Sequence, residues 1–103
     1  ETPPPPPPPA VLCAGKVATI VGDARSNVIR GTNRRDVIAA RGGNDVVLGR
    51  GGNDIICLGA GNDRASGGAG RDRILGGAGR DRLLGGPGRD RLVGGVGRDL
   101  VRQ

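Results

Sequence analysis

GGAGRDRIL (67–75), GGAGRDRLL (76–84), GGPGRDRLV (85–93) and GGVGRDLVR (94–102) are four consecutive nine-residue units of this chain. Each unit has glycine at its first, second and fourth positions, aspartate at the sixth and an aliphatic residue at the eighth. The aspartate recurs every nine residues over a longer stretch, at Asp36, Asp45, Asp54, Asp63, Asp72, Asp81, Asp90 and Asp99. A fixed short period predicts stacked repeats in which each unit packs on its neighbours.

Composition excludes an ordinary globular core. The 103 residues include 22 Gly and 8 Pro, with no aromatic residue, no Met and no His. A glycine- and proline-rich chain is typically disordered unless a period organises it. This chain can therefore bury apolar surface by stacking its repeats. Its length of 103 residues allows one domain.

The aliphatic position predicts how the repeats stack. It is occupied by Ile29, Ile38, Val47, Ile56, Ala65, Ile74, Leu83, Leu92 and Val101. One inward side chain in each three-residue strand, with outward neighbours, follows from the alternation of side chains along a strand. Two repeats, or eighteen residues, then form one coil with two strands and two turns. Ala65 is the smallest residue of this core, and no helix is expected because glycine disfavours helix interiors.

The aspartates are candidate calcium ligands. Calcium takes six to eight oxygen ligands, which one turn cannot supply but two stacked turns can. Stacking pairs each aspartate with the one eighteen residues later, which predicts about six ions in two rows. The pairs are Asp36/Asp54, Asp45/Asp63, Asp54/Asp72, Asp63/Asp81, Asp72/Asp90 and Asp81/Asp99, with Asn27/Asp45 as a weaker seventh. The turn carbonyls expected to contribute include those of Gly67, Gly70, Gly76, Gly79, Gly85, Gly88, Gly94 and Gly97. The alternative is that Asp and Gly only make good turns, without an ion.

The turns differ in glycine content. The pairs Asp72/Asp90 and Asp81/Asp99 have the full glycine pattern, whereas the turns ARGGND, GRGGND and LGAGND depart from it. The turn GTNRRD has Arg34 in place of glycine, which makes the Asp36/Asp54 site doubtful. A dinucleotide-binding reading of the glycines is not favoured, because no strand precedes them and no helix follows.

These units resemble the haemolysin-type, or repeats-in-toxin (RTX), calcium-binding β-roll. CAGKVATIVG followed by RGGNDVVLGRGGNDIIC is similar to small secreted calcium-binding proteins of bacteria with GC-rich genomes. The resemblance implies an all-β, right-handed parallel β-roll, calcium held by turn aspartates and carbonyls, and export from the cell. Members are commonly acidic, whereas this chain carries a formal charge of +6. Bound calcium would add positive charge, so affinities of about 10⁻⁴–10⁻³ M are expected.

Arginine flanks the aspartates on both sides. It precedes them at Arg71, Arg80, Arg89 and Arg98, and follows them at Arg64, Arg73, Arg82 and Arg91. These side chains either form a solvated outer face or pair with the aspartates and partly replace calcium.

The amino-terminal part lies outside the period. Residues 1–10 are proline-rich and are expected to form an extended tether. Residues 11–21 are expected to cap the first coil, with a strand over Val17–Val21, and residues 22–103 to form the roll. A chain that begins at Glu1 and enters a proline run is typical of a mature exported product. No hydrophobic run approaches the ~20 residues of a membrane span.

Two cysteines, Cys13 and Cys57, lie in the cap and in a predicted strand. In an exported chain without His, a disulfide is favoured over a zinc site, which needs about four ligands. Cys57 should face outward beside Val37 and Ile55, where the bond would fix residues 11–17 over an apolar patch.

The sequence predicts a function in calcium binding. The order of the chain would depend on extracellular calcium, and no arrangement of residues suggests an enzyme. The alternative is an adhesion or assembly module at the cell surface that binds acidic polymer or self-associates through outward Leu48, Leu75, Leu84 and Val93. Specific nucleic-acid binding is not expected, because no aromatic residue could stack on bases.

Overall fold

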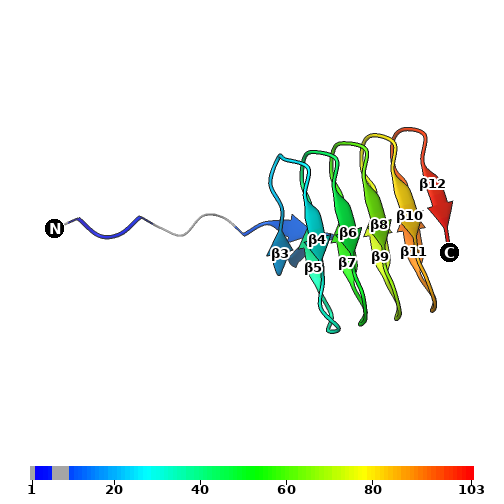
Figure 1. Ribbon diagram of the computed structural model, residues 1–103. Coiled ribbons are helices and arrows are strands. Elements are labelled where there is room, and N and C mark those ends of the chain that lie inside the picture. The colour runs from blue at the N-terminus through cyan, green and yellow to red at the C-terminus, as the bar shows by residue number, and fades with distance from the viewer. Residues whose placement is uncertain (1, 6–9) are drawn as a thin grey trace.

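The computed structural model describes residues 2–5 and 10–103, and within them the chain is built from short strands alone (Figure 1). The expected tether is only partly covered, because Glu1 and residues 6–9 lie outside the described residues. In chain order the strands are β1 (Leu12–Cys13), β2 (Lys16–Val17), β3 (Ile20–Val21), β4 (Val28–Arg30), β5 (Val37–Ala39), β6 (Val46–Leu48), β7 (Ile55–Cys57), β8 (Arg64–Ser66), β9 (Arg73–Leu75), β10 (Arg82–Leu84), β11 (Arg91–Val93) and β12 (Leu100–Arg102). No helix that could cross a membrane occurs in this part of the chain.

The strands form two parallel sheets that face each other across the solenoid. One sheet has the order β12-β10-β8-β6-β4 and the other β11-β9-β7-β5-β3. Each strand pairs with the strand two elements along, in a register of eighteen residues, as in Ile38 with Ile56 and Ile56 with Ile74. The predicted coil of two nine-residue repeats is confirmed.

The core is a column of single inward side chains, one from each strand. Ile38, Val47, Ile56, Ile74 and Leu83 are fully buried. Ala65, the smallest member, is also buried and belongs to the same cluster. The column weakens at the last strand of the sheet, where the inward residue Val101 is 43% exposed because no further described coil packs on it. The expectation of a buried Val101 is therefore wrong.

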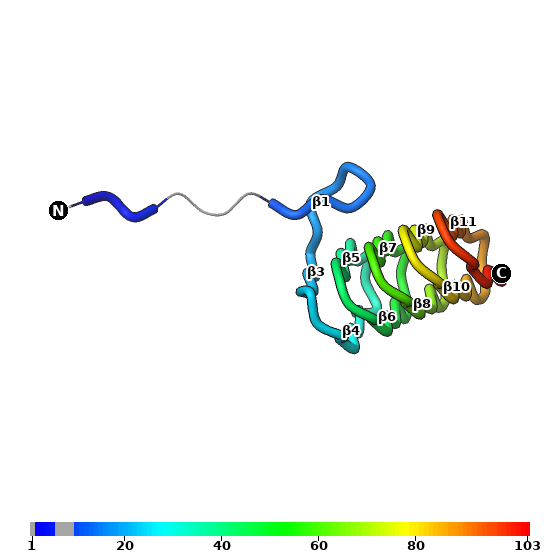
Figure 2. Tube along the Cα trace, turned by 90° about the horizontal axis from the view of Figure 1, so that it is seen from above, coloured from blue at the N-terminus to red at the C-terminus, as the bar shows by residue number. Residues whose placement is uncertain are grey.

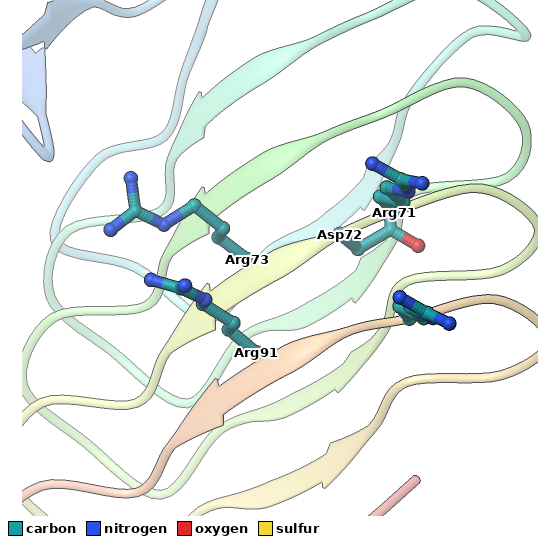
Figure 3. A pocket seen from close by; sticks show the side chains of 5 residues that line it. Arg71, Asp72, Arg73 and Arg91 are labelled. Carbon is teal, nitrogen blue, oxygen red and sulfur yellow. The ribbon is translucent and has the colours of Figure 1, made fainter.

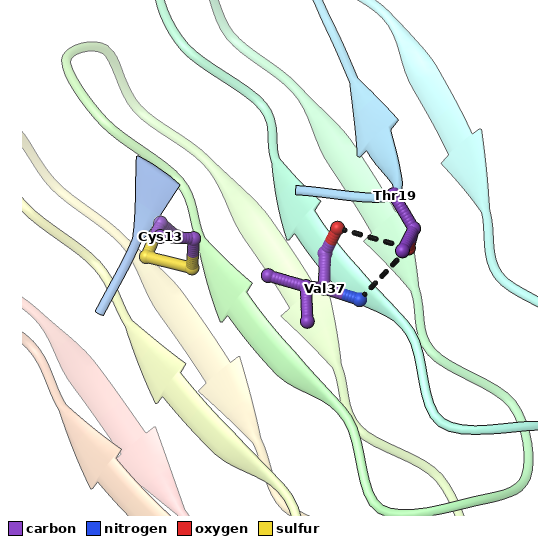
Figure 4. Close-up of a disulfide and its surroundings, with 4 residues drawn as sticks. Cys13, Thr19 and Val37 are labelled. Carbon is purple, nitrogen blue, oxygen red and sulfur yellow. Dashed lines mark hydrogen bonds between the residues drawn. A yellow bond between two sulfur atoms is a disulfide. The ribbon is translucent and has the colours of Figure 1, made fainter. Parts of the chain in front are cut away.

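The strand expected over Val17–Val21 is instead divided in two. Lys16–Val17 forms an antiparallel hairpin with β1, whereas Ile20–Val21 pairs in parallel with β5 as the first strand of its sheet. Thr19 continues this ladder with both its main chain and its side chain. Its N–H and its Oγ1 both donate to the Val37 carbonyl, and its Oγ1 also accepts the Val37 N–H at 3.0 Å (Figure 4).

The β1–β2 hairpin lies on the outer side of the sheet that contains β5 and β7 (Figure 2). A disulfide between Cys13 and Cys57 joins the hairpin to β7, with a Cα–Cα distance of 5.7 Å. Cys13, Val37 and Ile55 form a second buried cluster under the hairpin. The apolar outer face expected at these positions is present, and the hairpin covers it.

Candidate metal centre

Left-handed backbone conformations at fixed positions shape the turns. In the turn that ends at Asp72, Gly68 and Gly70 have φ angles of +81° and +103°. A residue with a Cβ is strained there, so glycine is the favoured residue. Two arginines adopt this conformation where the sequence lacks the second glycine, Arg41 at +71° and Arg50 at +70°. The turn shape is therefore retained even where the glycine pattern is incomplete.

Six of the eight repeat aspartates are hydrogen-bonded to the aspartate of the preceding coil, eighteen residues earlier. In every case the Oδ1 atom of the later residue accepts the main-chain N–H of the earlier one. The pairs, given as donor and acceptor, are Asp36/Asp54, Asp45/Asp63, Asp54/Asp72, Asp63/Asp81, Asp72/Asp90 and Asp81/Asp99, at 2.7–2.9 Å. The structure thus brings together all six pairs that the spacing predicts. They form two columns, one along each edge of the solenoid.

The second carboxylate oxygen of most of these residues is buried without any partner. The affected atoms are the Oδ2 atoms of Asp45, Asp54, Asp63, Asp72, Asp81 and Asp90. Five of these six residues, all except Asp90, are only 1% exposed. A buried charged oxygen without a partner is costly, and proteins resolve this by pairing it or binding a metal to it. These six atoms need a cation, or a proton, that the rest of the fold does not supply.

The first glycine of several turns, five residues before the aspartate, lines an opening between oxygen atoms. A Cβ built on Gly76 would lie 2.7 Å from Oδ2 of Asp81 and 2.5 Å from the carbonyl oxygen of Gly94, in the next coil. A Cβ on Gly49 would likewise lie 2.8 Å from Oδ2 of Asp54 and 2.7 Å from the Gly67 carbonyl oxygen. Carboxylate and carbonyl oxygens of two stacked turns therefore face one space that only glycine leaves open. This set of hard oxygen donors fits calcium.

Burial of these carboxyl groups changes their protonation. The pKa of Asp54 is raised from 3.8 to about 7, first by burial and then by the negative charges of Asp72 and Asp36. Burial, with smaller effects of neighbouring aspartates, raises the pKa values of Asp63 and Asp72 to about 6. The pKa of Asp81 is raised for the same leading reason. Columns of buried carboxyl groups bind protons unusually well when nothing else neutralises them.

Asp36 differs from the other aspartates because its own turn satisfies it. The Thr32 N–H donates to its Oδ2 at 2.7 Å, and the Thr32 hydroxyl donates to its Oδ1 at 3.0 Å. The same hydroxyl accepts the Arg34 N–H, so the turn GTNRRD closes on itself. These contacts occupy the Asp36 carboxylate, whereas the Oδ2 atoms of Asp54, Asp72 and Asp90 on the same edge have no partner.

On the opposite edge of the solenoid, which carries Asp45 and Asp63, some turns also depart from the repeat pattern. The turns before Asp45 and Asp63 have Ala40 and Leu58 in place of the first glycine, and both side chains are fully buried in the core. Asn27 donates its main-chain N–H to Asp45, but its side-chain amide faces Asp23 and Arg25. Its side chain is therefore not directed at a shared opening, which weakens the candidate seventh site.

A ladder of asparagines also supports the turns, and the sequence interpretation missed it. The Oδ1 atoms of Asn44, Asn53 and Asn62 accept the N–H of Asn62, Arg71 and Arg80 in the next coil, each at 2.8 Å. The signal was the GGND and GAGND spelling of these turns, in which asparagine precedes the aspartate. These contacts hold successive turns in register.

Arginine side chains do not take the place of a cation at the buried carboxylates. Each Oδ1 accepts a main-chain N–H, and each unpartnered Oδ2 receives no hydrogen bond at all. Among the described residues no three His, Cys, Asp or Glu side chains meet as a metal-binding group. A bound cation would therefore need the turn carbonyls as well as the paired carboxylates.

Comparison with known proteins agrees with this geometry. Residues 21–56, 30–65 and 66–101 each match the family described as "RTX calcium-binding nonapeptide repeat (4 copies)". No curated protein and no solved structure matches the chain. The matched segments run from Val21 to Val101 and include every paired aspartate. The chain belongs to the RTX calcium-binding nonapeptide-repeat family and folds as a β-roll of that type.

Proposed function

We propose that this protein is an exported calcium-binding module in which calcium completes the fold. The observation that carries the proposal is the set of six buried Oδ2 atoms without a partner. A divalent cation placed between stacked turns neutralises these charges and joins two coils at once. Calcium binding is then coupled to folding, because the unfolded chain does not hold the paired ligands together.

The pairs are not equivalent. The strongest sites are those in which a first glycine leaves the opening free, at Asp54/Asp72, Asp72/Asp90 and Asp81/Asp99. Asp36/Asp54 is weakest, because Thr32 already satisfies one of its carboxylates. A site at 100 times its dissociation constant stabilises the fold by about 2.7 kcal/mol.

Export is supported by the disulfide between Cys13 and Cys57. Disulfides form and persist in oxidising compartments outside the cytosol. With affinities of about 10⁻⁴–10⁻³ M, the roll would stay loose where calcium is scarce and become ordered where calcium is abundant. We assign the protein a structural, non-catalytic role, because its buried carboxylates are engaged in joining the coils.

Calorimetric titration with calcium tests the proposal on the wild type, Asp72→Asn and Asp23→Asn. Asp72 belongs to two pairs, so Asp72→Asn should lose up to two bound ions. Asp23 is exposed and outside the columns, so Asp23→Asn makes the same change in charge and should keep the wild-type number.

The calcium-free proteins separate loss of a ligand from loss of the fold. In Asp72→Asn the new amide would retain an Oδ1 that can accept the Asp54 N–H, and the variant removes a buried charge. Asp72→Asn should therefore be at least as stable as the wild type without calcium and less stable with it. Equal ion numbers in all three proteins, or no binding heat in the wild type, would overturn the proposal.

A further inference from the structure

We propose that the roll has a second binding site, a basic groove that takes a linear polymer bearing sulfate or phosphate esters. The groove is formed by Lys16, Arg35, Arg71, Arg73, Arg89 and Arg91 and runs along the outside of one turn edge. The polymer would bind to the protein's own cations, so this inference does not depend on calcium.

The centre of the groove is a group of four arginines. Arg71, Arg73, Arg89 and Arg91 line an open hollow of about 360 Å³ with Asp72 in its floor. Arg73 and Arg91 are register partners on adjacent parallel strands, which lie about 4.8 Å apart. Figure 3 shows their side chains extended in the same direction, with Arg71 on the other side of Asp72. Like charges at this separation repel, and a bound anion would relieve the repulsion.

The hollow continues toward the amino terminus. A second hollow of about 260 Å³ shares Arg71 and Arg73 and is also lined by Arg35 and by Lys16 of the hairpin. Asn53 lies in this wall and accepts the Arg71 N–H, which fixes the main chain at the junction. Two hollows with shared cations favour an extended ligand over a single small anion.

The cations of the groove are available to a ligand. All six basic side chains are exposed, whereas Asp72 is only 1% exposed. The Oδ1 atom of Asp72 accepts the Asp54 N–H, and its Oδ2 has no hydrogen-bond partner, so no arginine is hydrogen-bonded to either oxygen. The guanidinium groups therefore form the outer surface, and their planar donors match the oxyanions of sulfate and phosphate.

The chemistry of the chain also restricts the class of polymer. The chain has no aromatic residue that could serve as a stacking platform for the bases of a single-stranded nucleic acid. Recognition would depend on the charge and spacing of the anionic groups. The opposite edge offers a less complete set, in which Arg80, Arg82 and Arg98 are accompanied by Leu100.

Binding of dextran sulfate to the calcium-saturated full chain tests the inference, with neutral dextran and free sulfate ions as reference ligands. The variant Arg71→Gln/Arg73→Gln removes the two cations shared by both hollows. The matched control Arg25→Gln/Arg30→Gln removes the same charge from exposed positions that line neither hollow.

The groove variant should lose about tenfold or more in affinity and show a shallower salt dependence, by about two contacts. The control should stay within about twofold of the wild type, since its loss of general attraction is small. Equal losses of affinity in both variants would show that binding depends only on the net charge of the protein, which would overturn the inference. Free sulfate that binds as tightly as the polymer, or a single-stranded DNA that binds more tightly at equal charge, would overturn the ligand class.

Discussion

Gly76 lies directly against Asp81, so that a Cβ on the glycine would fall 2.7 Å from the carboxylate Oδ2. The same Cβ would fall 2.5 Å from the Gly94 carbonyl oxygen, in the coil above. This glycine is therefore required for the space between two oxygen donors, although its own backbone is not left-handed.

Gly76→Ala should remove one bound calcium ion, at Asp81/Asp99, and destabilise the calcium-bound roll by about 1–3 kcal/mol through overpacking. Calorimetric stoichiometry and urea denaturation measure the two effects. Gly42→Ala is the matched control, because a Cβ there has no neighbour closer than 3.5 Å and the backbone is not left-handed. A Gly76→Ala protein with the wild-type ion number would show that the opening is not where calcium binds.

The raised pKa values predict an unusual pH dependence for the calcium-free protein. The pKa of Asp54 rises to about 7, and those of Asp63 and Asp72 to about 6, from 3.8. The folded state therefore holds more protons than the unfolded state between pH 4 and 7. The stability that these protonated carboxyl groups contribute is fully present below pH 4 and is lost as the pH rises through 6 and 7.

Thermal unfolding of calcium-depleted protein should show a Tm at pH 5 that is about 5–10 °C above the Tm at pH 8. Saturating calcium should remove or reverse this difference, because it binds the ionised carboxylates. A calcium-free Tm that does not change between pH 5 and 8 would contradict the assigned burial of these groups.

Because Thr32 occupies the Asp36 carboxylate, its replacement is expected to create an additional calcium site. Thr32 and Arg34 give the turn before Asp36 a conformation without the left-handed residues of the other turns. Thr32→Gly/Arg34→Gly converts GTNRRD to the full glycine pattern and frees the Asp36 carboxylate. The variant should bind one more calcium ion than the wild type in a calorimetric titration. An unchanged ion number would mean that the Asp36/Asp54 pair lacks another ligand.

The disulfide is expected to contribute strongly to stability, and its contribution can be measured separately from that of calcium. Replacing both cysteines, Cys13→Ser/Cys57→Ser, should cost about 4 kcal/mol for a loop of 44 residues. Denaturation in calcium-saturated buffer measures this loss, and reductant should bring the wild type to the same midpoint while leaving the variant unchanged. A variant with the wild-type midpoint would show that the hairpin needs no bond to stay over Val37 and Ile55.

The period alone was sufficient to predict the main architecture. One aliphatic residue in nine, such as Ile56, indicates a single inward position, and an eighteen-residue coil then places Asp72 over Asp54. These relations follow from strand alternation and stacking, which depend on spacing rather than on atomic detail. The outward position of Cys57 follows from the same alternation, whereas its bond to Cys13 was expected because an exported chain with two Cys and no His favours a disulfide.

The remaining features depend on local contacts that a period does not contain. In six of the carboxylates, those of Asp45, Asp54, Asp63, Asp72, Asp81 and Asp90, one oxygen is hydrogen-bonded and the other has no partner. Whether Thr32 turns back onto Asp36, or Leu58 enters the core in place of glycine, depends on side-chain packing at one turn. The division of residues 16–21 into a hairpin strand and a sheet strand likewise reflects the disulfide and Thr19.

The aspartate contacts all point in one direction along the chain: the N–H of each earlier aspartate is held by a carboxylate that is synthesised eighteen residues later. In a chain that is synthesised or exported amino terminus first, the N–H of each aspartate would therefore find its acceptor only after the next eighteen residues have emerged. Each newly emerged turn would supply the carboxylate that accepts the N–H of the preceding coil. In a chain that emerges in this order, an interruption would leave only the most recent aspartate N–H groups without their carboxylate acceptors.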